Sequence, residues 1–225
     1  EIKPDCAEAH YNLANILKEH RKLQEAELSY RKAIEINPDY ANAHLNLGNL
    51  LSDLGKLKEA ELSTRKAIEL KPDFAEAHSN LGNLLRDLGK REEAKSHWAK
   101  AVELKPDEEK ALIALVHNLC YEQKYELALK YLHKNQSHSS QSLYLGCLLS
   151  LNREKDFNQK YKELNEQKIC NADIGSVIEH ANIIYDNKYE SPFCNEAIKY
   201  VVIEKIDEDS FSENHLSELI SYNKK

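Results

Sequence analysis

Six asparagines recur in the first half of the sequence with a spacing that suits hydrogen bonding to another polypeptide. They form a first column, Asn12, Asn46 and Asn80, and a second column three residues further on, Asn15, Asn49 and Asn83. A spacing of three places both columns on one face of successive helices. A primary amide carries a donor and an acceptor, which match the N–H and C=O groups of an extended peptide backbone. We interpret the columns as a peptide-binding site, while solvated asparagines at a generic repeat position would give the same pattern.

An acidic column accompanies the asparagines at the same period of 34 residues, and it consists of Glu19, Asp53 and Asp87. These carboxylates are expected on the same helix face as the amides. A groove with this lining favours neutral or basic peptides as ligands.

Three histidines, His10, His44 and His78, recur at the same period. Adjacent helices pack about 8–10 Å apart, whereas zinc–nitrogen bonds are about 2 Å long, so these side chains are too far apart to share a metal ion. We interpret them as histidines at the edge of the core. The sequence contains no G-x-G-x-x-G, G-x-S-x-G or H-E-x-x-H motif. We therefore predict no catalytic residues, no metal ligands and no cofactor, and expect that the chain is not itself an enzyme.

The elements that must position these side chains are set out by a strict repeat. Pro4, Pro38, Pro72 and Pro106 stand 34 residues apart, and each is followed by Asp. Such a fixed period is typical of repeat architectures. Each unit predicts two helices of about 14 residues, with a turn at HRK or LGK between them. We expect the aspartates that follow the prolines, Asp5, Asp39 and Asp73, to cap the first helix of each unit.

Small residues on the first helix, Ala14, Gly48 and Gly82, would let the second helix approach closely. The second helix offers a matching set to this seam in each unit: Ala26, Tyr30 and Ala33, then Ala60, Thr64 and Ala67, then Ala94, Trp98 and Ala101. One pair of helices cannot bury both of its apolar stripes, so neighbouring pairs must stack. The sequence therefore predicts an all-α fold, a right-handed α-solenoid whose first helices line an inner groove.

This pattern of a small residue, alanine, an aromatic residue, alanine and proline resembles the tetratricopeptide repeat over residues 7–108. The recurring A-x-A-H-x-N-L resembles the repeats in front of the catalytic domain of O-linked N-acetylglucosamine transferase. That resemblance implies that Asn12, Asn46 and Asn80 hold peptide backbone. The segment YESPFCNEAIKYV resembles the link between such repeats and an iron- and 2-oxoglutarate-dependent oxygenase in bacterial proteins.

The pattern predicts three regions along the chain. Residues 1–138 form the repeat array, with three regular units over 7–108 and a degenerate unit over 109–138. Residues 139–190 are expected to form degenerate helical capping repeats, the second helix of the first of them irregular. Residues 191–225 are expected to form a C-terminal tail or the start of a further domain, with a short strand at the β-branched residues 201–203.

The composition of the chain limits which cellular compartment and which classes of partner are expected. The net charge is −7 with both signs mixed along the chain, which argues against a nucleic-acid partner. No apolar run approaches the length of a membrane-spanning helix, so no membrane partner is expected. The five cysteines are odd in number and widely spaced, which indicates reduced thiols. Together these features favour a soluble cytoplasmic protein.

Three functions remain open from the sequence. The first is a protein-interaction scaffold that binds an extended peptide segment on its concave face. The second is the substrate-recognition arm of a larger enzyme, a glycosyltransferase or an oxygenase, whose catalytic domain lies outside this chain. The absence of any methionine favours a fragment of this kind. The third is a structural solenoid that self-associates through its end repeats.

Overall fold

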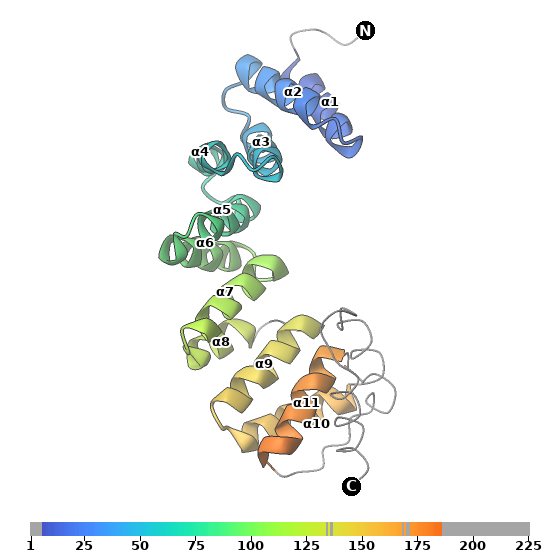
Figure 1. The fold of residues 1–225 in the computed structure, drawn as a ribbon, viewed down its shortest axis with the longest axis vertical. Coiled ribbons are helices and arrows are strands. Elements are labelled where there is room, and N and C mark those ends of the chain that lie inside the picture. Colours follow the sequence, from blue (N-terminus) through green and yellow to red (C-terminus); the bar gives the residue numbers. More distant parts are fainter. Residues whose placement is uncertain (1–5, 134, 136, 168, 170–171, 186–225) are drawn as a thin grey trace, which may run out of the picture. The chain divides into compact units, whose positions relative to one another are not determined.

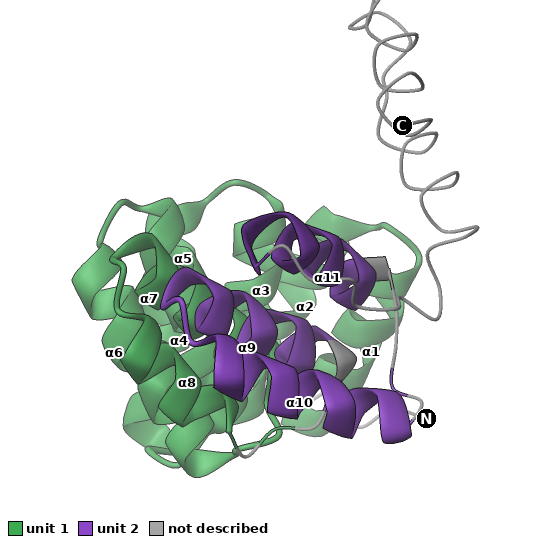
Figure 2. Cartoon of the chain, turned by 90° about the horizontal axis from the view of Figure 1, so that it is seen from below, with its two compact units in different colours: residues 1–135 green, residues 136–225 purple. Residues whose placement is uncertain are grey.

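The computed structural model describes residues 6–133, 135, 137–167, 169 and 172–185. These residues form eleven helices and no strand. The chain divides into two compact units, residues 1–135 and 136–225, which Figure 2 shows in separate colours. The strand predicted at 201–203 and the predicted tail from residue 191 lie outside the described residues.

Unit 1 consists of four helical hairpins, which we call repeats 1 to 4. The pairs are α1 (Ala7–Glu19) with α2 (Leu23–Ile36), α3 (Ala41–Asp53) with α4 (Leu57–Leu70), α5 (Ala75–Asp87) with α6 (Arg91–Leu104), and α7 (Glu109–Tyr121) with α8 (Tyr125–Leu132). Each pair packs on the next in chain order (Figure 1). In each repeat we call the first helix the A helix and the second the B helix. The two-helix unit predicted from the 34-residue period is confirmed.

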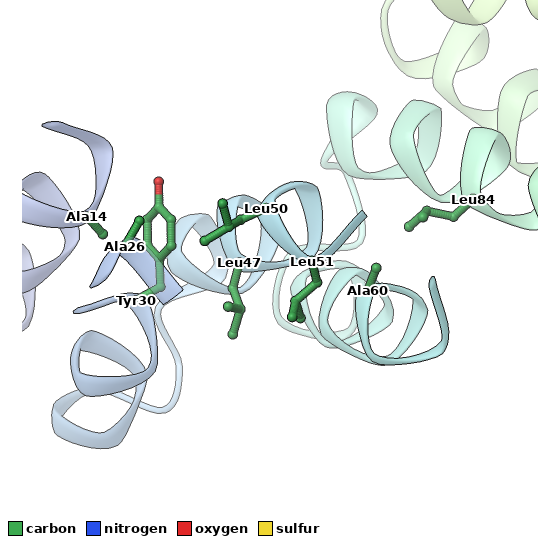
Figure 3. Packing of buried hydrophobic residues seen from close by; sticks show 8 residues of the cluster. All are labelled: Ala14, Ala26, Tyr30, Leu47, Leu50, Leu51, Ala60 and Leu84. Atoms are coloured by element: carbon green, nitrogen blue, oxygen red, sulfur yellow. The ribbon is translucent and has the colours of Figure 1, made fainter. Parts of the chain in front are cut away.

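The seam between the A and B helices depends on the small residues that the sequence analysis identified. All nine predicted B-helix residues of repeats 1 to 3 are buried, including Tyr30, Thr64 and Trp98. A Cβ atom added to Gly82 would lie 2.5 Å from the indole of Trp98, so the glycine is needed for the close approach. In repeat 1 the pair is instead Ala14 with Tyr30, in one apolar cluster that continues into repeats 2 and 3 (Figure 3).

The turn between the A and B helices contains a residue with left-handed backbone in every repeat of unit 1. This residue is Gly55 (φ 74°) in repeat 2 and Gly89 (φ 77°) in repeat 3, but Arg21 (φ 61°) in repeat 1 and Gln123 (φ 58°) in repeat 4. In repeat 1 the N–H of Lys22 then reaches back to the carbonyl of Leu17 across 2.9 Å, which closes the end of α1. The predicted turn positions are therefore correct.

The turn between repeats differs from the expectation in one respect. The residues that precede α3 and α5 as caps are Tyr40 and Phe74, and neither makes a side-chain capping hydrogen bond. The prediction that Asp39 and Asp73 cap these helices is therefore wrong, because each aspartate lies one residue too early. The turn is held instead by backbone hydrogen bonds and by the repeated histidines. Nε2 of His44 lies 2.9 Å from the carbonyl oxygen of Pro38.

The outer surface carries ion pairs that link successive B helices. Glu27 accepts hydrogen bonds from Arg31 and from Lys56, and Arg31 also reaches Glu59 at 2.8 Å. One repeat later the same arrangement consists of Glu61 with Arg65 and Lys90, and of Arg65 with Glu93. The hydrogen bond from Lys56 lowers the pKa of Glu27, and burial opposes this shift. The ion pairs add a polar connection to the apolar contact between repeats.

Unit 2 contains α9 (His138–Ser150), α10 (Glu154–Glu166) and α11 (Ala172–Tyr185), and α9 contacts both others. The expectation of an irregular second helix is wrong, because α10 is regular and buries Phe157 and Leu164 two turns apart. A Cβ on Gly146 would meet no atom within 4 Å, so this glycine does not serve a seam of the kind found at Gly82. None of the described helices is both long and apolar enough to span a membrane.

Candidate functional site

The asparagine columns are joined into a ladder across repeats. Nδ2 of Asn46 donates to Oδ1 of Asn15 at 3.1 Å, and Nδ2 of Asn80 donates to Oδ1 of Asn49 at 2.8 Å. In both cases the first column of one repeat donates to the second column of the preceding repeat. The structure therefore brings the predicted residues together, and it gives them a role in coupling the A helices.

Aromatic residues of the B helices hold two members of the second column from the other side. The hydroxyl of Tyr30 donates to Oδ1 of Asn15 at 2.5 Å, and Nε1 of Trp98 donates to Oδ1 of Asn83 at 3.1 Å. Burial raises the pKa of Tyr30 to about 12, so the hydroxyl stays protonated and able to donate. In repeat 2 the corresponding residue is Thr64, which donates to the Ala60 carbonyl instead.

These contacts make the two columns chemically different. All three oxygens of the second column accept hydrogen bonds from the protein, so the amide N–H groups are the side-chain groups of Asn15, Asn49 and Asn83 that these bonds do not use. The first column uses an N–H group within the ladder at Asn46 and Asn80, which leaves their oxygens as acceptors. The interpretation of every amide as both donor and acceptor is therefore too simple. That interpretation left out the hydrogen bonds between neighbouring repeats, because the sequence of one repeat does not show how close the next repeat lies.

A polar hollow of about 320 Å³ lies over the A helices of unit 1. Five of the nine predicted site residues line it: Asn49, Asn80, Asn83, Asp53 and Asp87. The rest of the lining is Lys18, Ser52, Glu76, Leu84 and Lys110. The four other predicted residues, Asn12, Asn15, Asn46 and Glu19, lie outside the hollow. The hollow is centred on the A helices of repeats 2 and 3.

Charges in the hollow are mixed, with an acidic excess. Asp53, Glu76 and Asp87 supply three carboxylates, and Lys18 and Lys110 supply two ammonium groups. Lys18 pairs with Asp53 at 3.3 Å, and Asp87 pairs with Arg86 outside the hollow. Lys110 was not predicted as a site residue. Its position, 34 residues after Glu76, was the signal that could have identified it.

Repeat 4 ends the ladder. Ala114 and His117 stand where Asn80 and Asn83 stand one repeat earlier, so no amide of α7 continues either column. At the position of Asp87 the helix carries Tyr121, a residue that is 73% exposed and whose ring centroid lies 4.9 Å from the guanidinium carbon of Arg91. The chemistry of the face therefore changes from amide and acidic groups to an aromatic and cationic pair.

Comparison with known families identifies the repeat. Models described as the tetratricopeptide repeat match residues 7–40, 29–61 and 75–108, and a model described as the TPR repeat matches residues 48–85. Residues 7–108 are therefore tetratricopeptide repeats, as the sequence pattern predicts. This repeat is a scaffold for binding and not a catalytic domain, so the array itself is not an enzyme. The closer resemblance to the transferase repeats stays a prediction.

Solved structures agree on the fold. The structure of pilF from Pseudomonas aeruginosa superposes with a TM-score of 0.63 at 20% identity, over 80% of this chain and 84% of that one. YrrB, described as a TPR protein with an unusual peptide-binding site, superposes with a TM-score of 0.58 at 20% identity, over 80% of this chain and 93% of that one. The first TPR domain of Spaghetti (RPAP3), bound to the HSP90 peptide SRMEEVD, superposes with a TM-score of 0.51 at 24% identity, over 54% of this chain and 97% of that one. No curated protein matches the sequence. The predicted all-α repeat solenoid is confirmed.

Proposed function

We propose that the array is a protein-interaction scaffold which holds an extended segment of a partner protein along its A helices. The observation that carries this proposal is the hollow lined by Asn49, Asn80 and Asn83, in which the ladder fixes the orientation of the amides. The resemblance of the A-x-A-H-x-N-L pattern to peptide-holding repeats supports the same site.

The division of the columns suits a peptide backbone. In the hollow the amide N–H groups of Asn49 and Asn83 donate to peptide carbonyl oxygens, and the oxygen of Asn80 accepts from a peptide N–H group. Because the ladder and Trp98 already hold the side chains, little rotamer entropy is lost on binding. The site therefore recognises an extended backbone without depending on its side chains.

The charge of the hollow selects against acidic segments. Three carboxylates face two ammonium groups; Asp53 is paired with Lys18, and Asp87 is paired with Arg86 outside the hollow. The HSP90 peptide bound to the Spaghetti domain, SRMEEVD, carries three acidic residues. For the present chain we propose a neutral or basic segment, which the acidic excess would attract.

The expected affinity is modest. A hydrogen bond contributes about 0.5–1.5 kcal/mol net, so three amides supply only about 1.5–4.5 kcal/mol before the ordering cost of the peptide. Unless side-chain pockets add to this, a Kd of about 1 mM or weaker follows.

The test is to select peptides against the full chain and titrate the best one by calorimetry into the double variant N49A/N80A. This variant removes both partners of one ladder bond, so neither is left buried without a partner, and alanine favours the helix. We expect about tenfold weaker binding with an unchanged melting temperature. N42A, which makes the same change at an exposed asparagine of α3 outside both columns, is the matched control and should bind normally. Equal affinity in N49A/N80A would exclude the hollow as the site.

A second candidate function, self-association through an end repeat, is favoured by one feature of α1. Leu13 and Ile16 are 40% and 52% exposed, whereas their counterparts in α3, Leu47 and Leu50, are 4% and 0% exposed against the preceding repeat. Light scattering of the full chain and of L13K/I16K tests this candidate. A concentration-dependent dimer that the variant abolishes would support it, and a monomer at every concentration would contradict it.

A further inference from the structure

The link between successive B helices changes between repeats 3 and 4. In repeats 1 to 3 an arginine of one B helix pairs with a glutamate of the next, 28 residues further on. These pairs are Arg31 with Glu59, at 2.8 Å, and Arg65 with Glu93. One period later the two positions hold Ala99 on α6 and Leu127 on α8. No such ion pair can therefore form between α6 and α8, and Leu127 is 40% exposed.

A hollow of about 730 Å³ lies between α6 and α8, and we call it the B-helix hollow. Its lining includes Ala99 and Val102 of α6, and Lys130 and Tyr131 of α8. The hollow between α2 and α4, whose lining includes the arginine and the glutamate of the first ion pair, has about 460 Å³. The B-helix hollow is thus the larger of the two, and its volume lies within the range of about 300–1,000 Å³ that is usual for ligand sites.

The polar groups of the B-helix hollow leave one cation for a ligand. Nζ of Lys100 lies 3.0 Å from Oε2 of Glu103, and both residues line the hollow. Lys130 is exposed, and its ammonium group has no ion-pair partner among the residues that the structure describes. The Nδ1 atoms of His78 and His97 lie 2.9 Å apart and so contact each other. The ammonium groups of the lining therefore exceed its carboxylates by one.

We propose that the B-helix hollow binds an acidic segment of a partner protein, in which an apolar side chain lies against Ala99 and Val102 and a neighbouring carboxylate pairs with Lys130. The hydroxyl of Tyr131 can donate to the same carboxylate. Because Lys130 is exposed, the ion pair contributes mainly to specificity, and the apolar contact supplies most of the affinity.

The charge preference of this site is opposite to that of the hollow over the A helices. There three carboxylates face two ammonium groups, whereas here two ammonium groups face one carboxylate. The two hollows therefore select different segments, and binding at the B-helix hollow does not depend on the proposed function.

The test is an NMR titration of the full chain with three peptides that differ only in the central residue: GFEFG, GFQFG and GFKFG. Both ends of each peptide are blocked, so the central residue alone carries charge. We expect GFEFG to shift the backbone amides of residues 96–106 and 130–131. At low ionic strength it should bind about two- to fivefold more tightly than GFQFG, and GFKFG should bind most weakly. The preference should vanish in about 0.5 M NaCl, since salt screens an exposed ion pair.

Three variants assign the binding to the B-helix hollow. K130Q removes an exposed cation without touching the core, and it should bind GFEFG and GFQFG equally. K58Q makes the same change at an exposed lysine of α4 outside the hollow and should keep the preference. A99R/L127E installs the ion pair of the preceding repeats and should weaken GFEFG binding about fourfold, which corresponds to the loss of one methylene contact.

Several results would overturn the site. They are an acidic preference that persists in K130Q, equal binding of GFEFG and GFKFG, unchanged binding in a folded A99R/L127E, and the absence of shifts with all three peptides. Shifts confined to residues 49–53 and 80–87 would also overturn it, because they would place the acidic peptide in the hollow over the A helices.

Discussion

Nε1 of Trp98 donates a hydrogen bond to Oδ1 of Asn83 across 3.1 Å, and this contact connects the core of repeat 3 to the hollow. Trp98 is 1% exposed, and it approaches α5 only because residue 82 is glycine. In repeat 1 the corresponding set is Ala14, Tyr30 and Asn15, with the same donor-to-amide bond. The seam between the helices therefore determines how the second-column amide is held.

The first prediction concerns the fit between Gly82 and Trp98. G82A should lower the free energy of unfolding by about 1–3 kcal/mol, because the added methyl group overlaps the indole. The double variant G82A/W98Y reproduces the combination found in repeat 1 and should recover most of that loss. Thermal and urea unfolding of the three proteins measure the effect. A double variant less stable than G82A would show that the seams are not interchangeable.

The second prediction separates the two asparagine columns. N83A removes the acceptor of a buried indole N–H and should destabilise the protein by about 1–3 kcal/mol. N80A leaves only the oxygen of Asn49 unpaired, at a hollow where water can replace the donor, and alanine improves the helix. Its effect should stay within about 0.5 kcal/mol. Equal losses in both variants would contradict the division of roles between the columns.

The fold could be predicted in detail for repeats 1 to 3, and the reason lies in particular residues. Pro38 and Pro72 mark the turns, and Gly82 opposite Trp98 specifies which helix faces meet. The caps could not be predicted, because Asp39 satisfies the sequence rule for a cap while the helix begins one residue too late for it. A local pattern does not show which of two adjacent residues adopts the capping conformation.

Five of the nine predicted site residues line the hollow, and the hydrogen bonds that orient their amides could not be predicted. The period placed Asn49, Asn80 and Asn83 on one face, where the structure has the hollow. Which end of each amide is free depends on the spacing between neighbouring repeats, and only the folded array contains that distance. The pairing of His78 with His97 was also missed, since Ser63 occupies the equivalent position in repeat 2.

The third prediction concerns the left-handed residue of the turn in repeat 1. Arg21 has φ 61°, a conformation that costs an L-residue about 1–2 kcal/mol, so R21G should stabilise the protein by about 1 kcal/mol. G55A is the reverse change in repeat 2, where a Cβ would meet no atom within 4 Å. It should destabilise by a similar amount through the backbone alone. Melting temperatures that shift in the same direction for both variants would contradict this account.

The last prediction concerns Glu61, which links α4 to α6 on the outer surface. Its side chain is 13% exposed and accepts hydrogen bonds from Lys90 at 2.9 Å and from Arg65 at 2.8 Å. Burial alone would raise the pKa of Glu61, but the hydrogen bonds from Lys90 and Arg65 outweigh it and lower the pKa below 4.5. The stabilisation is therefore present above about pH 4.5 and is lost as pH falls through the lowered value. E61Q should cost about 1–2 kcal/mol at neutral pH, and the difference from the wild type should shrink toward about pH 3.

Glu69 provides the control for this effect, because it also pairs with a lysine on α4 but is 69% exposed. An exposed ion pair of this kind contributes about 0.5 kcal/mol or less, and added salt screens it. E69Q should therefore unfold almost like the wild type in urea at neutral pH, and the stability difference between E61Q and the wild type should persist in about 0.5 M NaCl. If E61Q and E69Q lost equal stability, or if the loss in E61Q vanished with salt, Glu61 would be an ordinary surface charge. The coupling of successive repeats would then rest on the apolar contacts around Leu50 and Leu84 alone.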